Sequence, residues 1–93
     1  MTQDEEIRRG YEAERVMAEP LLQEAFAKIE SAIVEAMRQV KLGDHKTQHE
    51  LVVMLQLHGR IRGHFKECME TGKLARIQKE TMADKVKRLA RIA

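Results

Sequence analysis

The fold of this chain is indicated first by one stretch, Leu51–Leu57, which reads LVVMLQL. Six of its seven residues are apolar, and it lies inside a longer segment with the pattern of a helix. Seven residues make about two helical turns, so these side chains point in every direction around the axis. A helix that is apolar all round is either fully buried or used as an interface. Because a chain of 93 residues has little else to cover it, we expect a small helical protein completed by a partner, most simply by copies of itself.

The composition favours an all-α fold. The 93 residues suffice for one domain, 1–93, which buries only about 60–65% of the surface of its unfolded chain. Aromatic residues make up 3% of the sequence, so the core must consist of Leu, Ile, Val, Met and Ala, most of which suit helices. One proline and five glycines are too few for a series of β-turns.

Three features predict a protein that is soluble and cytoplasmic where it is made. The single cysteine, Cys68, excludes an internal disulfide and fits a reducing compartment. Residues 2–6 are polar and acidic, unlike a signal peptide. The longest uninterrupted apolar run, Leu51–Leu55, is far shorter than the ~20 residues that span a membrane.

Helices are predicted at about 3–18, 20–41, 47–70 and 73–92. Thr2 is placed to cap the first helix, whose apolar stripe is thin, and Pro20 separates it from the second. We therefore expect residues 1–18 to be the least stable part, an arm that is mobile or ordered by a partner or by the third helix. The sequence Thr47–Glu50 (TQHE) has the form of a capping box that starts the third helix, and Gly72 is expected to end it.

Two apolar seams predict an antiparallel hairpin of the second and third helices within a small helical bundle. Each seam has the alternating spacing of three and four residues that is typical of packed helices. The loop between them is only about five residues long, which favours an antiparallel pair. The seams consist of Leu22, Phe26, Ile29, Ile33, Ala36 and Val40 in the second helix, and of Leu51, Met54, His58, Ile61, Phe65 and Cys68 in the third.

No reaction is indicated by the sequence, and we expect neither an enzyme nor a bound cofactor or metal. Ser31 lies in mid-helix without a glycine-rich elbow, and the glycines are too scattered to cradle a phosphate. His45 and His49 have the spacing of metal ligands on a helix, as do His64 and Cys68. The two pairs lie too far apart along one helix, about 22 Å, to meet at one ion. His58 lies on the seam, where a hydrogen-bonded interior or interface histidine is expected.

Two groups of residues are candidates for contact with partners. We expect a protein interface at Val52, Val53, Leu57, Gly59 and Gly63. The valines and Leu57 do not fit on the face that the hairpin covers. The two glycines share one helix face, which favours close approach of another backbone from this chain or a second subunit.

The second candidate group is basic. Residues 1–37 carry a net charge of −5, whereas residues 73–93 carry +5, and these ends can complement each other within or between chains. Contact of the C-terminal helix with nucleic acid or an acidic partner would use Lys73, Arg76, Lys79, Lys85, Lys87, Arg88 and Arg91. The alternative is that these residues form the solvated side of an amphipathic helix, since no aromatic residue is interleaved for base stacking.

The run Glu19–Phe26 (EPLLQEAF), followed by an aliphatic helix that leads to Glu70–Ala75 (ETGKLA), resembles a group of small helical tailed-bacteriophage proteins. The resemblance covers about residues 8–78. These proteins are usually encoded in the head and packaging gene block. The resemblance implies a virion-structural or DNA-packaging accessory without catalytic residues, and it does not extend to the basic end.

Together these observations lead to a non-enzymatic helical assembly protein, of a bacteriophage particle or its packaging apparatus, that docks onto itself or onto a larger protein of the virion. We expect it to be made in the host cytoplasm and incorporated in the virion. The first alternative is a small nucleic-acid-binding module that uses residues 73–93. A further alternative is an inhibitor that binds one host protein.

Overall fold

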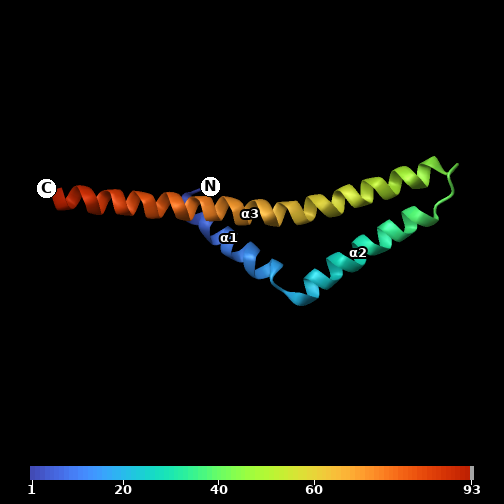
Figure 1. Cartoon of the computed structure of the whole chain (residues 1–93), viewed down its shortest axis with the longest axis horizontal. Coiled ribbons are helices and arrows are strands. Elements are labelled where there is room, and N and C mark those ends of the chain that lie inside the picture. Colours follow the sequence, from blue (N-terminus) through green and yellow to red (C-terminus); the bar gives the residue numbers. More distant parts are fainter. Residues whose placement is uncertain (93) are drawn as a thin grey trace. The chain divides into compact units, whose positions relative to one another are not determined.

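The computed structural model describes residues 1–92, and all its secondary structure is helical. Its elements are α1 (Gln3–Met17), α2 (Pro20–Gln39) and α3 (His45–Ile92). They contain 15, 20 and 48 residues, which confirms the predicted all-α fold (Figure 1). No helix within residues 1–92 is long and apolar enough to cross a membrane.

The first two helices begin where the sequence predicts. The Thr2 hydroxyl caps α1 by accepting a hydrogen bond of 3.2 Å from the Glu5 amide. Glu19 is extended, with φ −68° and ψ 117°, and Pro20 occupies the first turn of α2. The proline ring excludes helical geometry at Glu19, so the break between α1 and α2 follows directly from the sequence.

The predicted start of the third helix is wrong by two residues. α3 begins at His45, and its cap is Asp44, whose Oδ1 accepts a hydrogen bond of 3.1 Å from the Thr47 amide. The hydrogen bond of the Thr47 side chain and, to a smaller extent, that of its backbone amide lower the pKa of Asp44. The loop is tied to the helix by Gln48, whose side-chain amide donates bonds of 3.0 Å to the carbonyls of Lys41 and Leu42. A carboxylate accepts this capping bond better than a threonine hydroxyl, which explains the earlier start.

The predicted break at Gly72 is also wrong, because α3 continues through it to Ile92. No glycine among the described residues has a positive φ, so Gly72 does not take the left-handed conformation that ends helices. Gly72 instead lies at the crossing of α1 over α3. A Cβ atom built on Gly72 would lie 2.7 Å from the Cα of Gly10 and 2.9 Å from the Glu6 carbonyl oxygen. The glycine is therefore required by close approach and not by a turn.

The described residues form two compact units. One contains residues 1–15, with most of α1, and α3 from Phe65 to Ile92, and the other is residues 16–64. The second unit is the predicted antiparallel hairpin of α2 and the beginning of α3, joined by the loop in Figure 1. Its buried apolar residues are Phe26, Ile33 and Leu51, and His58 is buried with them.

The predicted seam on α3 is partly wrong. Leu51 and His58 are buried, but Met54 and Ile61 are about half exposed. The intervening half-buried positions are Leu55 and Arg62. Arg62 takes this place because its guanidinium lies 5.7 Å from the Phe26 ring centroid and 3.5 Å from Glu30. Both contacts favour a partly covered arginine.

Candidate functional site

His58 of α3 contacts Phe26 of α2 inside the hairpin. Its Nε2 lies 3.0 Å from the Phe26 carbonyl oxygen, and the two rings meet edge to face at a centroid distance of 5.5 Å. A carbonyl can only accept, so Nε2 must carry the proton that is donated. The expectation of a hydrogen-bonded interior histidine is confirmed, and the role of His58 is structural.

The residues considered as metal ligands are not gathered by the fold. Within residues 1–92, no three side chains of His, Cys, Asp or Glu are grouped closely enough to hold a metal ion. His45 and His49 are exposed at the start of α3. The Cys68 sulfur lies 3.8 Å from Nη2 of Arg9, which donates to it across the α1–α3 crossing.

Two of the seven basic residues proposed for partner contact are used within the chain. Arg76 donates a hydrogen bond of 3.0 Å to the Tyr11 hydroxyl, stacks 4.6 Å from that ring's centroid and lies 3.5 Å from Glu14. The bond to Tyr11 raises the pKa of Arg76. Lys79 pairs with Asp4 at 2.8 Å. The acidic start and basic end therefore complement each other inside one unit.

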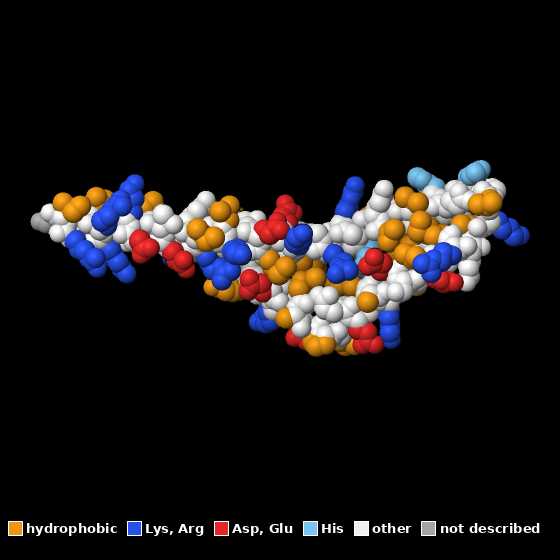
Figure 2. Space-filling model, in the orientation of Figure 1, with side chains coloured by type: hydrophobic (Ala, Val, Ile, Leu, Met, Phe, Trp, Pro, Cys, Tyr) orange, Lys and Arg blue, Asp and Glu red, His pale blue; other side chains and the backbone are white. Residues whose placement is uncertain are grey.

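The other five basic residues, Lys73, Lys85, Lys87, Arg88 and Arg91, are exposed. The last four of them, near the end of α3, surround a stripe formed by Met82, Val86 and Leu89, which are spaced four and three residues apart and are also exposed. In Figure 2, hydrophobic and basic side chains alternate along this part of α3. This distribution is typical of an amphipathic helix with a solvated basic side.

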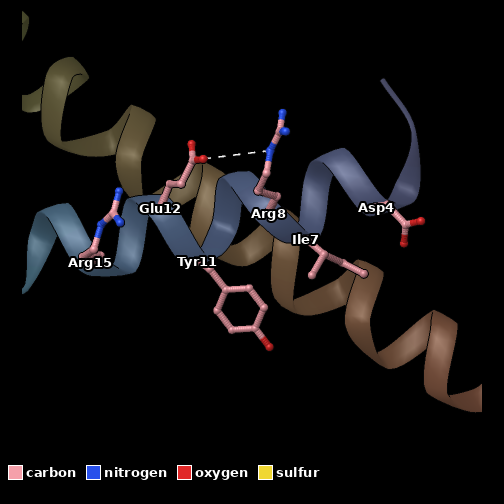
Figure 3. A pocket seen from close by; sticks show the side chains of 6 residues that line it. All are labelled: Asp4, Ile7, Arg8, Tyr11, Glu12 and Arg15. Atoms are coloured by element: carbon pink, nitrogen blue, oxygen red, sulfur yellow. Dashed lines mark ion pairs between the residues drawn. The ribbon is translucent and has the colours of Figure 1, made fainter.

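One depression, of about 400 Å³, lies against the outer face of α1. Figure 3 shows that all six residues lining it come from this one helix, namely Asp4, Ile7, Arg8, Tyr11, Glu12 and Arg15. Arg8 and Glu12 pair beside it at 3.9 Å. A depression with walls from a single helix leaves most of a bound small molecule in water, unlike the concave sites that bury ligands.

The predicted interface residues lie on two different sides of α3. Val53 and Leu57 are four residues apart and share one side. Val52, Gly59 and Gly63, at spacings of seven and four, share another. Val52, Val53 and Leu57 are exposed. The close backbone approach expected at Gly59 and Gly63 is not made by any of residues 1–92, since a Cβ built on either would meet open space within 4 Å.

Three exposed apolar residues were missed by the sequence analysis, which placed Ile29, Met54 and Ile61 inside the hairpin. Each is about half exposed, at 49%, 51% and 53%. The sequence feature that indicates their exposure is the pair of opposite charges at Glu30 and Arg62. Each of these residues lies four positions after a buried ring, that of Phe26 or that of His58. Opposite charges at equivalent positions favour the register in which those positions face each other.

Comparison with protein-family models, with curated proteins and with solved structures gives no match for this chain.

Proposed function

We propose that the protein is a non-enzymatic helical assembly protein that works by docking onto itself and onto a larger protein. The observation that carries the proposal is the excess of exposed over buried apolar side chains. The buried apolar residues are Ala13, Phe26, Ile33, Leu51 and Ala75. The exposed ones on α3 alone are Val52, Val53, Met54, Leu57, Ile61, Leu74, Ile77, Met82, Val86, Leu89 and Ile92.

Exposed apolar side chains on this scale favour association. Burying apolar surface contributes roughly 25 cal/mol per Å², and large exposed patches mark interaction sites. Both units of the chain leave such residues uncovered, Leu57 and Ile61 in one and Val86 and Leu89 in the other. Docking through these residues stabilises the chain and requires no catalytic group.

The resemblance to tailed-bacteriophage proteins suggests where such docking takes place. A small helical protein from a head and packaging gene block assembles with the virion or the packaging apparatus. The larger partner is then a protein of the particle, and the chain is made in the host cytoplasm. These assignments rest on the resemblance of residues 19–26 and 70–75 alone.

Nucleic-acid binding by the end of α3 is a second candidate, favoured by its five exposed basic residues. Arg76 and Lys79 support it less, because both contact α1. The two functions respond differently to salt. Phosphate contacts lose affinity steeply as salt rises, whereas apolar docking is nearly indifferent to it.

Measurement of the mass in solution by light scattering or sedimentation tests the proposal. We expect a species larger than the 10.8 kDa chain at micromolar concentration, little changed between low and high salt. A monomer that binds duplex DNA only at low salt would support the second candidate instead. A monomer at high micromolar concentration, without DNA binding, would contradict both.

A further inference from the structure

One side of the hairpin in residues 16–64 is apolar and uncovered. The buried positions are Phe26 and Ile33 on α2, and Leu51 and His58 on α3. On each helix, the residues three and four positions after a buried one lie to its two sides, because the helix turns through about 100° per residue. Ile29 and Ile61 lie three positions after the buried Phe26 and His58, and we call them third positions. Glu30 and Arg62 lie four positions after the same two residues, and we call them fourth positions.

The ion pair between Glu30 and Arg62 fixes which sides match. Their 3.5 Å separation places the two fourth positions on the same side of the hairpin. The two third positions, Ile29 and Ile61, must then share the opposite side. The antiparallel arrangement of α2 and α3 leads to the same result. The two helices face each other from opposite sides, and their residues rotate about the axis in opposite senses when viewed from one end. These two reversals cancel, so equivalent positions on α2 and α3 lie on the same side of the hairpin.

The helical repeat extends this side along both helices. We define the apolar hairpin face as Ala25, Ile29, Ala32 and Ala36 of α2 together with Met54, Leu57 and Ile61 of α3. None of these side chains is charged, and the same repeat places one charged residue, Glu50, next to Met54 on this side of α3. The four larger ones are between 49% and 53% exposed. The α2 part consists mainly of alanine, and the α3 part consists of large residues.

We propose that a second copy of the chain covers the apolar hairpin face with its own, so that two hairpins form a four-helix bundle. This inference rests on the proposed function and names the partner at this face. These apolar side chains require an apolar partner surface, and the neighbouring carboxylate of Glu50 disfavours nucleic acid and acidic peptides. The same face of a second copy meets this requirement.

The distribution of residue sizes makes the face complementary to itself. With the two-fold axis parallel to the helices, α3 of one copy lies over α2 of the other. Met54, Leu57 and Ile61 then pack onto the alanines of the opposite chain, and the same contacts repeat across the axis. Large residues against small ones fill such a layer without voids, and antiparallel neighbours are the usual arrangement of a four-helix bundle.

The size of the face approaches the size that a stable pair requires. From Ala25 to Ala36 it extends about 20 Å with its side chains, and two packed helices are about 20 Å wide. This gives roughly 400 Å² in projection. Because side chains protrude from the helices, the accessible area of the face is larger than its projection. It therefore approaches the roughly 600–1,000 Å² that each partner contributes to a stable interface.

Two matched pairs of variants of the full chain test the inference by sedimentation equilibrium. The first pair is Leu57→Asp, on the face, and Val52→Asp, on the Glu30–Arg62 side. The second pair is Ala32→Arg, on the face, and Ala27→Arg, on the other side. Ala27 and Ala32 are both exposed, and arginine favours a helix, so this second pair remains informative if Leu57→Asp unfolds the hairpin. Circular dichroism monitors the helix content of all four variants.

We expect the wild-type chain to form dimers, and Leu57→Asp and Ala32→Arg to raise the dissociation constant more than about tenfold. Val52→Asp and Ala27→Arg should leave it within about twofold. If the chain self-associates but the Val52 and Ala27 variants are the ones that dissociate, the face is misassigned while the proposed function stands. A wild-type chain that stays monomeric at high micromolar concentration would overturn this inference and also the self-association in the proposed function.

Discussion

Gly10 and Gly72 face each other at the crossing of α1 over α3, at a distance that admits no side chain on either. A Cβ atom on Gly10 would lie 2.9 Å from the Cα of Gly72, and one on Gly72 would lie 2.7 Å from the Cα of Gly10. Both obstacles are backbone atoms, which cannot rotate away as a side chain can. The two helices must therefore separate if either glycine is replaced.

This contact predicts opposite effects for the same substitution at two sites on α3. Gly72→Ala should lower the free energy of unfolding by about 1–3 kcal/mol, because the added methyl group forces the helices apart. Gly59→Ala should raise it by about 0.5–1 kcal/mol, since alanine favours a helix and the site is open. Urea unfolding at a fixed chain concentration measures both. Stabilisation by Gly72→Ala would show that the close crossing does not exist.

His58 should matter more to stability than any other histidine of α3. Replacing it with alanine removes its hydrogen bond to the Phe26 carbonyl and its contact with the Phe26 ring. We expect a loss of about 2–4 kcal/mol. The matched control is His49→Ala on the same helix, where the side chain is exposed and the change should stay within about 0.5 kcal/mol. Equal effects at the two sites would contradict the structural role of His58.

The fold was predictable from the sequence wherever local chemistry decides it. Thr2 marks the start of α1, and Pro20 marks the start of α2, because each acts through its own backbone and nearest neighbours. Gly72 was misinterpreted because glycine serves both at helix ends and at close crossings. The two uses are distinguished only by whether another backbone, here that of Gly10, approaches.

The candidate site was predictable only in part, for a similar reason. The apolar run at residues 51–57 predicted side chains outside the face that the hairpin covers, and Val53 and Leu57 are exposed. The side of the hairpin that is uncovered depends on the rotation of each helix. That rotation follows from Arg62, which an apolar seam pattern assigns to solvent, although it lies over Phe26 and pairs with Glu30.

The Asp44 cap predicts a pH dependence at the start of α3. Its hydrogen bonds with Thr47 lower its pKa below the ordinary value of 3.8. The folded state therefore binds this proton more weakly than the unfolded chain. The stabilisation is fully present above that ordinary value and is lost as the pH falls through the lower folded value.

Comparison of Asp44→Ala with the wild type should show this dependence in thermal unfolding. The difference in Tm should be constant near neutral pH and shrink as the pH is lowered through and below the ordinary carboxyl range. Asp44→Asn keeps an acceptor for the Thr47 amide without the titrating group, and asparagine is a good cap. Its Tm should therefore stay close to that of the wild type. A difference between Asp44→Ala and the wild type that grows at acid pH would contradict the assigned sign.

We expect the contacts of α1 with α3 to be the weaker part of the fold. These contacts include a crossing of small residues, the ion pairs of Asp4 with Lys79 and of Glu14 with Arg76, the Arg76 contact with Tyr11 and the Arg9 contact with Cys68. The side chains of Asp4 and Lys79 are largely exposed, whereas those of Arg76 and Glu14 are 32% and 47% exposed. Exposed ion pairs contribute about 0–1 kcal/mol each, and α1 buries only Gly10 and Ala13. We therefore expect the amides of residues 7–17 to exchange hydrogen faster than those of α2 around Phe26 and Ile33. Arg76→Gln should accelerate exchange in α1 up to about fivefold and leave α2 unchanged. Arg88→Gln, farther along α3, is the control and should change neither. Protection of α1 equal to that of α2 in the wild-type chain would show that α1 is an integral part of the core.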